Sequence, residues 1–545
     1  MLTVLKSLYN TRYLKILFCI AVLCYAWIVL VVQHGEVLYA IQDFSPWLGT
    51  SDFLALYAGH PGGLREWLGC WFTQLFYLPW LGATVLVSFW SVIVWALIKA
   101  NRLVGWWQTI ALVPIIALLA SMTDLGYWIF CLKARSYWFG PTLGLLAVSL
   151  VQWFYSRSGE RGRLLSLTLM ILFGYPVLGW YATLGVIAMM LCSPWRRPKS
   201  AWLKLLCATL AALIAVSALY FQSPTICWRE GTLFYGFHHL INPEASSLVL
   251  EVPFWVMAIS VIAMPLMARI QQGRFVQWLP VSLVLLTLGG GNMINYRNAN
   301  FHTELRMLRA MDEARWDDVL SELKRASSKP TREMVIMKDV TLAQQGQLGE
   351  KAFDYPIGGV RPMMNIDLPI HMAHSAAPLF YYWLGIPNYA FVWCMENYIE
   401  YGMSPFYLRM MYRCMVANGE HEAAEKYKTL LKTTLFYSDF EVSDEEIKAV
   451  QRFMTGHDQL TNDRGYSEKY LLERLSQETY DTPEAQQIAV HFAILSRSQV
   501  SFDKALSRYK ELLQAASSEE KALPKYFNQK VFEWYYESNT GNKSY

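Results

Sequence analysis

Residues 76–98, FYLPWLGATVLVSFWSVIVWALI, decide what kind of protein this is. The stretch runs for 23 residues without a single Lys, Arg, Asp or Glu. A helix rises about 1.5 Å per residue, so roughly 20 apolar residues cross the ~30 Å hydrocarbon core of a bilayer. The stretch is therefore predicted to be a transmembrane helix.

Similar apolar runs lie on both sides of this stretch, as far as residue 295. We expect further spans at about 14–32, 104–122, 138–156, 201–220, 252–270 and 277–294. The first of these is interpreted as an uncleaved anchor, because its apolar core is long and no small-residue cleavage site follows. The run 164–192 is too long for one span and short for two, and Gly174-Tyr175-Pro176 interrupts it. It is interpreted as a tight helical hairpin or re-entrant pair and counted as two crossings.

Charged residues are distributed unevenly between the two halves of the chain. Residues 1–295 carry 18 Lys/Arg and 9 Asp/Glu, whereas residues 296–545 carry 29 and 34. Cytoplasmic loops are enriched in Lys and Arg. With about nine crossings, 14 of the 18 basic residues lie inside and 8 of the 9 acidic residues outside. This topology places the N-terminus in the cytoplasm and residues 296–545 outside it. The net charge of +4 comes from loops beside the spans, so no nucleic-acid partner is expected.

The second half has apolar residues at three- and four-residue spacing, which is typical of helices. Gly385 and Gly419 stand 34 residues apart, and so do Ala390 and Ala424. This is the period of tetratricopeptide repeats, in which two helices are joined by a tight turn. The glycine permits the turn, and the small alanine lets the second helix approach the first.

Weaker copies of the same pattern follow Ala314, Gly346 and Phe502, which indicates about five helix pairs. The fold class predicted for the whole chain is all-α. A transmembrane bundle of about nine crossings occupies 1–295, and a tetratricopeptide-like α-solenoid occupies 296–545. Stacked pairs share a core and leave a concave surface on which a protein partner can bind.

Several short motifs are shared with a known family. They are Pro61-Gly62-Gly63-Leu64, Phe72-Thr73-Gln74-Leu75-Phe76, Glu313-Ala314-Arg315-Trp316-Asp317 and the run from Leu384 to Ala424. On these the chain resembles an uncharacterised family of bacterial multi-pass membrane proteins, described only as a domain of unknown function. The resemblance covers nearly the whole chain and implies the architecture, but no activity.

A second resemblance is to polytopic glycosyltransferases of the GT-C type, which have an acidic first outer loop and often a soluble C-terminal domain. The outer loops here are 33–75 and 221–251. The resemblance implies that Asp43 or Asp52 acts as a base or binds a divalent cation, and that Arg65 or Arg229 binds the phosphate of a polyprenyl-linked sugar. The alternatives are solvated loop acids, and an ion pair between Arg65 and Glu66.

Other candidate residues have a structural explanation beside the functional one. Tyr381, Tyr382 and Trp383 could stack on a partner, or they could pack within the repeats. His238 and His239 point about 100° apart on a helix and cannot easily share a metal. His371 and His374 share one helical face, and Asp367 could be a third ligand, but structural or surface histidines are the alternative and no metal is expected. Cys394 and Cys414 could form a disulfide if their helices lie close together.

No nucleophile elbow, zinc-protease motif, phosphate-binding loop or dinucleotide fingerprint occurs in a supporting context. Apart from the divalent cation of the glycosyltransferase alternative, no cofactor is expected. The main hypothesis is a multi-pass inner-membrane protein of a Gram-negative bacterium that presents a repeat domain to a protein partner in the periplasm. A glycosyltransferase is the alternative. A transporter ranks last, because no acidic residue is clearly placed at mid-membrane.

Overall fold

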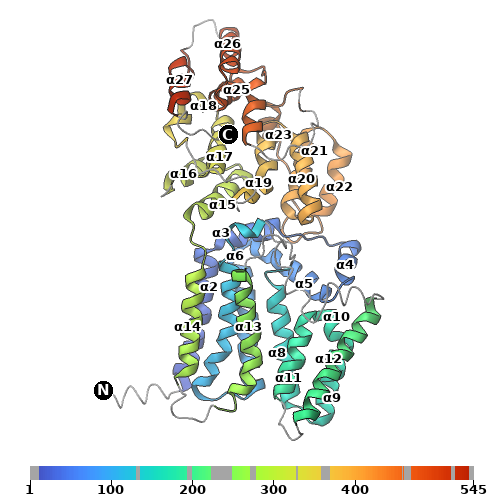
Figure 1. Ribbon diagram of the computed structural model, residues 1–545. Coiled ribbons are helices and arrows are strands. Elements are labelled where there is room, and N and C mark those ends of the chain that lie inside the picture. Colours follow the sequence, from blue (N-terminus) through green and yellow to red (C-terminus); the bar gives the residue numbers. More distant parts are fainter. Residues whose placement is uncertain are drawn as a thin grey trace, which may run out of the picture. The chain divides into compact units, whose positions relative to one another are not determined.

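The computed structural model describes residues 12–130, 136–192, 199–221, 248–270, 278–326, 329–357, 369–456, 458, 468–516 and 522–538. Within these ranges all the regular elements are helices (Figure 1), which confirms the all-α class. The chain divides into two compact units. The first is Met1–Arg297 with Thr433–Phe436, and the second is Asn298–Lys432 with Tyr437–Tyr545.

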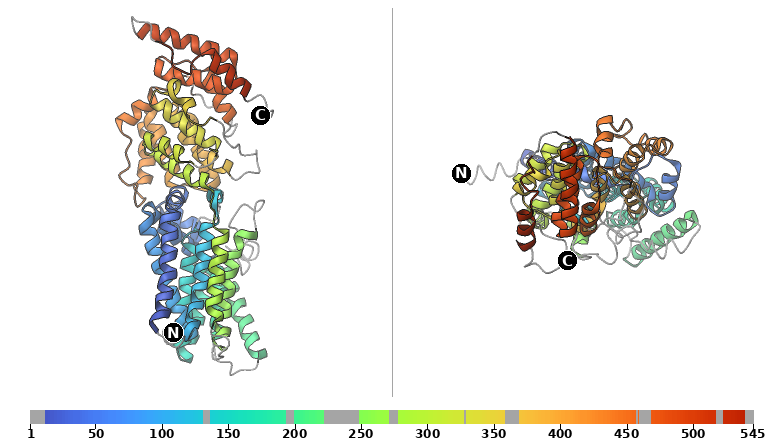
Figure 2. Two further views of the ribbon diagram at one scale, coloured as in Figure 1. Left: turned by 90° about the vertical axis from the view of Figure 1, so that its left-hand side faces the viewer. Right: turned by 90° about the horizontal axis from the view of Figure 1, so that it is seen from above.

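The first unit, here called the membrane unit, is built from long apolar helices and several shorter ones. Its α-helices are α2 (Arg12–Ile28), α3 (Gly35–Phe44), α4 (Ser51–Ala58), α5 (Gly63–Thr73), α6 (Pro79–Asn101), α7 (Val113–Thr123), α8 (Gly140–Arg157), α9 (Glu160–Leu169), α10 (Tyr175–Leu178), α11 (Trp180–Cys192), α12 (Lys199–Phe221), α13 (Leu248–Met267) and α14 (Leu279–Ile294). Short π- and 3₁₀-helices extend several of them: η1 (Val29–Gln33), η2 (Gln74–Tyr77), η3 (Gly105–Leu112), η4 (Gly126–Phe130) and η5 (Met170–Gly174). The long helices run side by side (Figures 1 and 2).

Five helical segments of the described chain are long and apolar enough to cross a membrane, which indicates a membrane protein. They are Tyr13–Gln33, Pro79–Asn101, Gly105–Thr123, Glu160–Leu178 and Leu250–Met267. Shorter apolar helices cover Trp180–Cys192, Trp202–Val216 and Leu279–Ile294. The predicted span 138–156 coincides with α8, although α8 is not among the five.

The run 164–192 forms two helical segments, and they meet at Gly179. Residues 160–178 are continuously helical through α9, η5 and α10, and α11 follows directly. The interruption expected at Gly174-Tyr175-Pro176 is instead a π-helical turn, η5, that runs directly into α10 with Pro176 near its start. The chain turns only at Gly179, whose φ of +63° favours glycine.

The second unit, here called the helical unit, contains the remaining elements. They are α15 (Ala299–Asp312), α16 (Trp316–Arg325), α17 (Arg332–Gln344), α18 (Leu348–Lys351), η8 (Ala352–Asp354), α19 (Pro369–Trp383), α20 (Pro387–Tyr401), α21 (Pro405–Ala417), α22 (His421–Leu431), α23 (Asp444–Gln451), α24 (Glu468–Gln477), α25 (Pro483–Ser496), α26 (Gln499–Ala516) and α27 (Gln529–Ser538).

Helix pairs are present at four of the predicted positions, with turns at Ala314, Gly385, Gly419 and Arg497, each of which has a positive φ. Gly346 also has a positive φ, but only the four-residue α18 and the short η8 follow it. Ala390 and Ala424, on the second helices of two pairs, are buried as their role in close packing requires.

Three helices of this unit are buried on nearly every side. All 13 residues of α17 are buried, as are residues 485–495 of α25 and most of α21. Helix α25 contacts α17 and α18, about 140 residues earlier, and Gln487 bonds to both Gly346 O and Gly349 N. A linear stack would join only successive repeats. In this unit, contacts also join elements that are far apart in the sequence. Helix α17 contacts both its neighbours in the chain and α25, so it lies at the centre of the unit.

Candidate functional site

Arg65 is the most unusual charged residue of the membrane unit. It lies in the first turns of α5 and is only 6% exposed. Its Nη2 donates to Glu66 Oε1 at 3.0 Å, and its guanidinium lies 5.0 Å from the centroid of the Tyr181 ring on α11. Its Nε finds no acceptor. A buried guanidinium with a spare N–H is a group that could bind a phosphate or carboxylate oxygen.

Arg65 is held where three segments approach closely. Gly62, which precedes α5, has a φ of +80° and donates its N–H to Pro176 O at 2.8 Å. A Cβ on Gly62 would lie 3.1 Å from Gly179 N, so the two turns are in backbone contact. A Cβ on Gly140, the first residue of α8, would lie 3.3 Å from Arg65 Nη1. Glycines therefore let α5, α8 and the α10–α11 turn converge around the arginine.

The structure does not join the two candidate aspartates to Arg65. Asp43 is buried on α3, at 4% exposed, whereas Asp52 is an exposed residue in the first turn of α4. The ion pair of Arg65 is instead with Glu66, as the structural alternative expects. His60 adds a second contact to Glu66, with Nε2 3.9 Å from Oε2. Arg229, His238 and His239 lie outside the described residues.

Asp124 is a further buried acid, and it lies just beyond the span that ends at Thr123. It is 9% exposed, and neither carboxylate oxygen bonds to another described residue. Burial raises its pKa to about 7. Its charge acts on Tyr137, whose hydroxyl donates to Ser121 O at 2.8 Å. From the sequence, Asp124 is not a candidate site residue, and the only signal that marks it is an acid at the end of an apolar helix.

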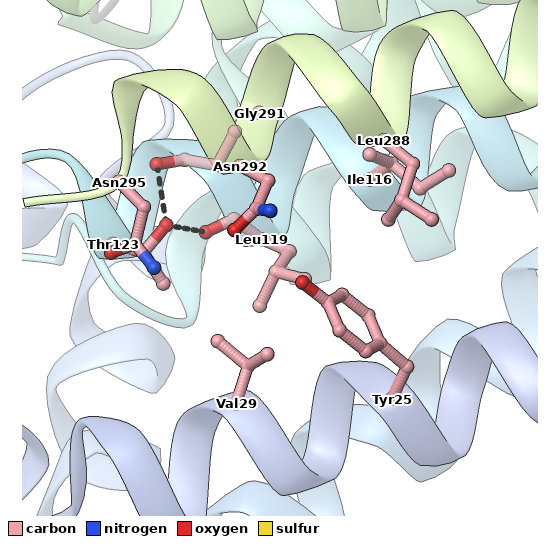
Figure 3. Close-up of a pocket in the computed structure, with 10 residues that line it drawn as sticks. Tyr25, Val29, Ile116, Leu119, Thr123, Leu288, Gly291, Asn292 and Asn295 are labelled. Atoms are coloured by element: carbon pink, nitrogen blue, oxygen red, sulfur yellow. Dashed lines mark hydrogen bonds between the residues drawn. The ribbon is translucent and has the colours of Figure 1, made fainter.

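A small cavity lies between α2, α7 and α14 (Figure 3). Its volume is about 20 Å³, which is room for about one water molecule. Tyr25 and Thr123 bring hydroxyls to its wall, and Asn292 and Asn295 bring amides. The Thr123 hydroxyl already donates to the carbonyls of Leu119 and Ala120. A cavity of this size holds solvent rather than a substrate.

In the helical unit, the candidate partner-binding rings are buried. Tyr381 and Tyr382 are 0% exposed, and Trp383 is 1% exposed. The Tyr382 hydroxyl donates to Glu446 Oε1 at 2.9 Å, and Trp383 packs edge-on against Trp316 with centroids 4.8 Å apart. These side chains are committed to packing and are not presented to a partner.

A buried ion network joins α15 to α21. Asp312 bonds to Arg413 Nη1, and its Oδ2 lies 2.5 Å from Arg409 Nη1. Arg413 also donates from Nη2 to the Asp312 carbonyl at 2.8 Å, and its Nε lies 2.9 Å from Glu446 Oε1. Burial alone would raise the pKa of Asp312, but the two guanidiniums outweigh it and lower the pKa to about 2.

A second buried network lies on α17. Asp339 Oδ1 is 3.0 Å from Lys338 Nζ and 3.1 Å from His491 Nε2 on α25, and Lys338 also donates to Ala352 O at 3.1 Å. Burial lowers the pKa of Lys338. For Asp339, burial opposes ionisation, but the charges of Lys338 and His491 prevail and lower its pKa. Both networks link helices to one another, and neither faces an open site.

Metal ligands do not gather among the described residues, where no group of three His, Cys, Asp or Glu side chains occurs. His371 has no described side chain, and His374 packs against Trp393. Cys394 and Cys414 are both buried free thiols, so the possible disulfide is not formed.

Comparison with known proteins identifies a family but no activity. No curated protein and no solved structure matches the chain. One family model, described as "Family of unknown function (DUF6057)", matches residues 8–543. This agrees with the resemblance drawn from the short motifs. The chain therefore belongs to this family of unknown function.

Proposed function

We propose that this protein is a multi-pass inner-membrane protein whose helical unit binds another protein in the periplasm. One observation carries the proposal. Among the described residues of the helical unit, the buried charged groups around Asp312 and Asp339 and the rings of Tyr381 to Trp383 are used in ion networks and packing. What remains for function is a surface of helix pairs, and such surfaces bind proteins.

The periplasmic location is supported by charge. With about nine crossings, 14 of the 18 basic residues before residue 296 fall on one side of the membrane. The chain after Arg297 then emerges on the opposite side. A repeat unit held there by a membrane anchor is suited to gathering partners at the membrane surface.

A second candidate is a glycosyltransferase that uses a polyprenyl-phosphate sugar. The observation in its favour is the buried Arg65, whose Nε has no acceptor and could meet a phosphate. Asp43 or Asp52 would act as base, and a divalent cation would be required only here. Glu66 already neutralises Arg65, so this candidate ranks second.

A photo-reactive residue placed at Ile399 in living cells tests the main proposal. Ile399 on α20 is 74% exposed, whereas Ala390 on the same helix is fully buried and serves as the control. We expect irradiation to give one discrete crosslinked protein from Ile399 or neighbouring exposed positions, and none from Ala390. In the same cells, Asp43→Asn and Asp52→Asn should leave surface glycan unchanged. Loss of the glycan, with no crosslink from any exposed position of the unit, would favour the enzyme.

A further inference from the structure

The carboxyl of Asp124 is buried without the partners that normally accompany such burial. Among the described residues, neither oxygen bonds to another residue and no ion pair involves them; the backbone amide of Asp124 itself offsets the burial only in part. An ionised carboxylate in this position is strongly disfavoured, because its lost hydration is not replaced. The folded turn around Asp124 therefore favours the neutral, protonated acid.

Among the described residues, no cation acts on the charge of Asp124. Among the elements packed against the end of α7, the described residues of α14 and η3 carry no titratable group. Glu251 on α13 has the same sign as Asp124 and accepts from the Trp255 indole. Arg297 is the nearest cation in the chain segment after α14, and its Nη2 is bonded to Asn292 at Oδ1 and at the carbonyl.

The remaining titratable groups near Asp124 are tyrosines, which are neutral over the ordinary range of pH. Tyr137 is bonded to Ser121 O, and Tyr25 lies across the small cavity that Thr123 lines. Tyr127 lies in η4, which begins just after Asp124 in the chain. None of these groups supplies a positive charge to offset an ionised Asp124.

The residues on either side of Asp124 contact the segment through which the chain leaves the membrane unit. This segment, residues 295–297 after α14, is here called the exit segment. Thr123 O accepts from Tyr296 N at 2.8 Å. A Cβ on Gly126 would lie 2.6 Å from the Tyr296 ring, and Tyr127 meets the same ring edge-on at 6.2 Å between centroids. Tyr296 stands directly before Arg297, the last residue of this unit before the helical unit begins at Asn298. Asp124 is thus the centre of a turn that fixes the exit segment.

We propose that Asp124 is a proton-binding site that controls this exit segment: the protonated acid keeps the turn closed around Tyr296, and loss of the proton loosens it. The direction of the pH effect follows from the thermodynamic linkage between protonation of Asp124 and opening of the turn. A carboxyl exposed by opening has a pKa near 3.9, whereas burial raises that of Asp124 to about 7. The closed turn is most stable below about pH 4 and loses stability as pH rises toward 7, by up to about tenfold in the opening constant per pH unit.

Trypsin cleavage after Arg297 measures the opening, because Arg297 lies in the exit segment. The full-length protein in lipid nanodiscs is digested between about pH 5 and about pH 8, on both sides of the pKa of about 7. Cleavage after Arg325, which is exposed in the helical unit, corrects for the pH dependence of trypsin itself. We expect the ratio of the two rates to rise at least about tenfold up to pH 7 and then to level off.

Two variants test whether Asp124 itself causes the pH dependence of cleavage. Asp124→Asn, which cannot ionise, should give a ratio that is flat with pH. Asp52→Asn, at an exposed aspartate of the same unit, should behave like the wild-type protein. A flat ratio in the wild-type protein overturns the proposal, and this measurement does not depend on whether the variant folds. An equal rise in Asp124→Asn also overturns it.

Discussion

Replacing Asp312 by Asn should destabilise the helical unit by about 3–5 kcal/mol, because it leaves two buried guanidiniums facing a neutral amide. Asp312, Arg409 and Arg413 are each at most 4% exposed, so water cannot take the place of the carboxylate. Glu446 remains, but of the two guanidiniums it pairs with that of Arg413 and not with that of Arg409. Urea titration of the detergent-solubilised full chain, followed by amide hydrogen exchange in α15 and α21, measures the loss.

The matched control is Glu425→Gln. Glu425 pairs with Lys432 on the surface at 3.4 Å, and both side chains are more than half exposed. Removing an exposed pair should change stability by no more than about 0.5 kcal/mol. Equal effects of the two substitutions would show that the Asp312 network does not stabilise the fold.

The Asp312 network also predicts acid sensitivity. The pKa of Asp312 is about 2 in the folded unit and near 3.9 in an unfolded chain, a difference equivalent to about 2.5 kcal/mol. Because the folded pKa is depressed, this stabilisation is present above about pH 4 and is lost as pH falls toward 2. Asp312→Asn should lack that step, so its difference from the wild-type protein should shrink below pH 4.

Replacing Gly385 by Ala should be far more damaging than the same change at Gly419. Both glycines stand at the turn of a helix pair, and both have a φ of +76°. A Cβ on Gly385 would lie 2.3 Å from the Phe453 carbonyl carbon, whereas a Cβ on Gly419 would meet nothing within 4 Å. Gly419→Ala therefore incurs only backbone strain, about 1–2 kcal/mol.

Gly385→Ala incurs the same strain and also forces Phe453 away from the turn. Overpacking of this kind adds about 1–3 kcal/mol, so the expected total is about 2–5 kcal/mol. The same urea titration compares the two variants, each serving as the control for the other. Equal losses of stability in the two variants would mean that the close approach of Phe453 to the turn at Gly385 does not constrain the fold.

Local patterns allowed much of this fold to be predicted. A run without charges such as 76–98 marks a membrane helix, because burial in lipid acts on each residue separately. The 34-residue spacing of Gly385 and Gly419 located two turns, because only glycine accepts their backbone conformation readily. Contacts between distant segments left no such trace. Nothing in the residues of α17 indicates that His491 would pair with Asp339 across about 150 positions.

The candidate site was less predictable. Arg65 was identified from its chemistry, but its contact with Tyr181 depends on the turn at Gly179 and so on tertiary structure. The importance of Asp124 lies in its missing partners, which only the packing of α7 against α13 and α14 reveals. For Tyr381, Tyr382 and Trp383, the sequence does not distinguish rings that pack inside the unit from rings that face a partner.

A pair of reporters fused after Tyr545 tests the central claim most directly. If the helical unit lies in the periplasm, alkaline phosphatase at this position should be active and green fluorescent protein should be dark. Fusions after Gly159, in the short turn between α8 and α9 that Arg157, Arg161 and Arg163 flank, should give the opposite pattern and so verify both reporters. A fluorescent, phosphatase-negative fusion after Tyr545 would place the unit in the cytoplasm and contradict the proposed function.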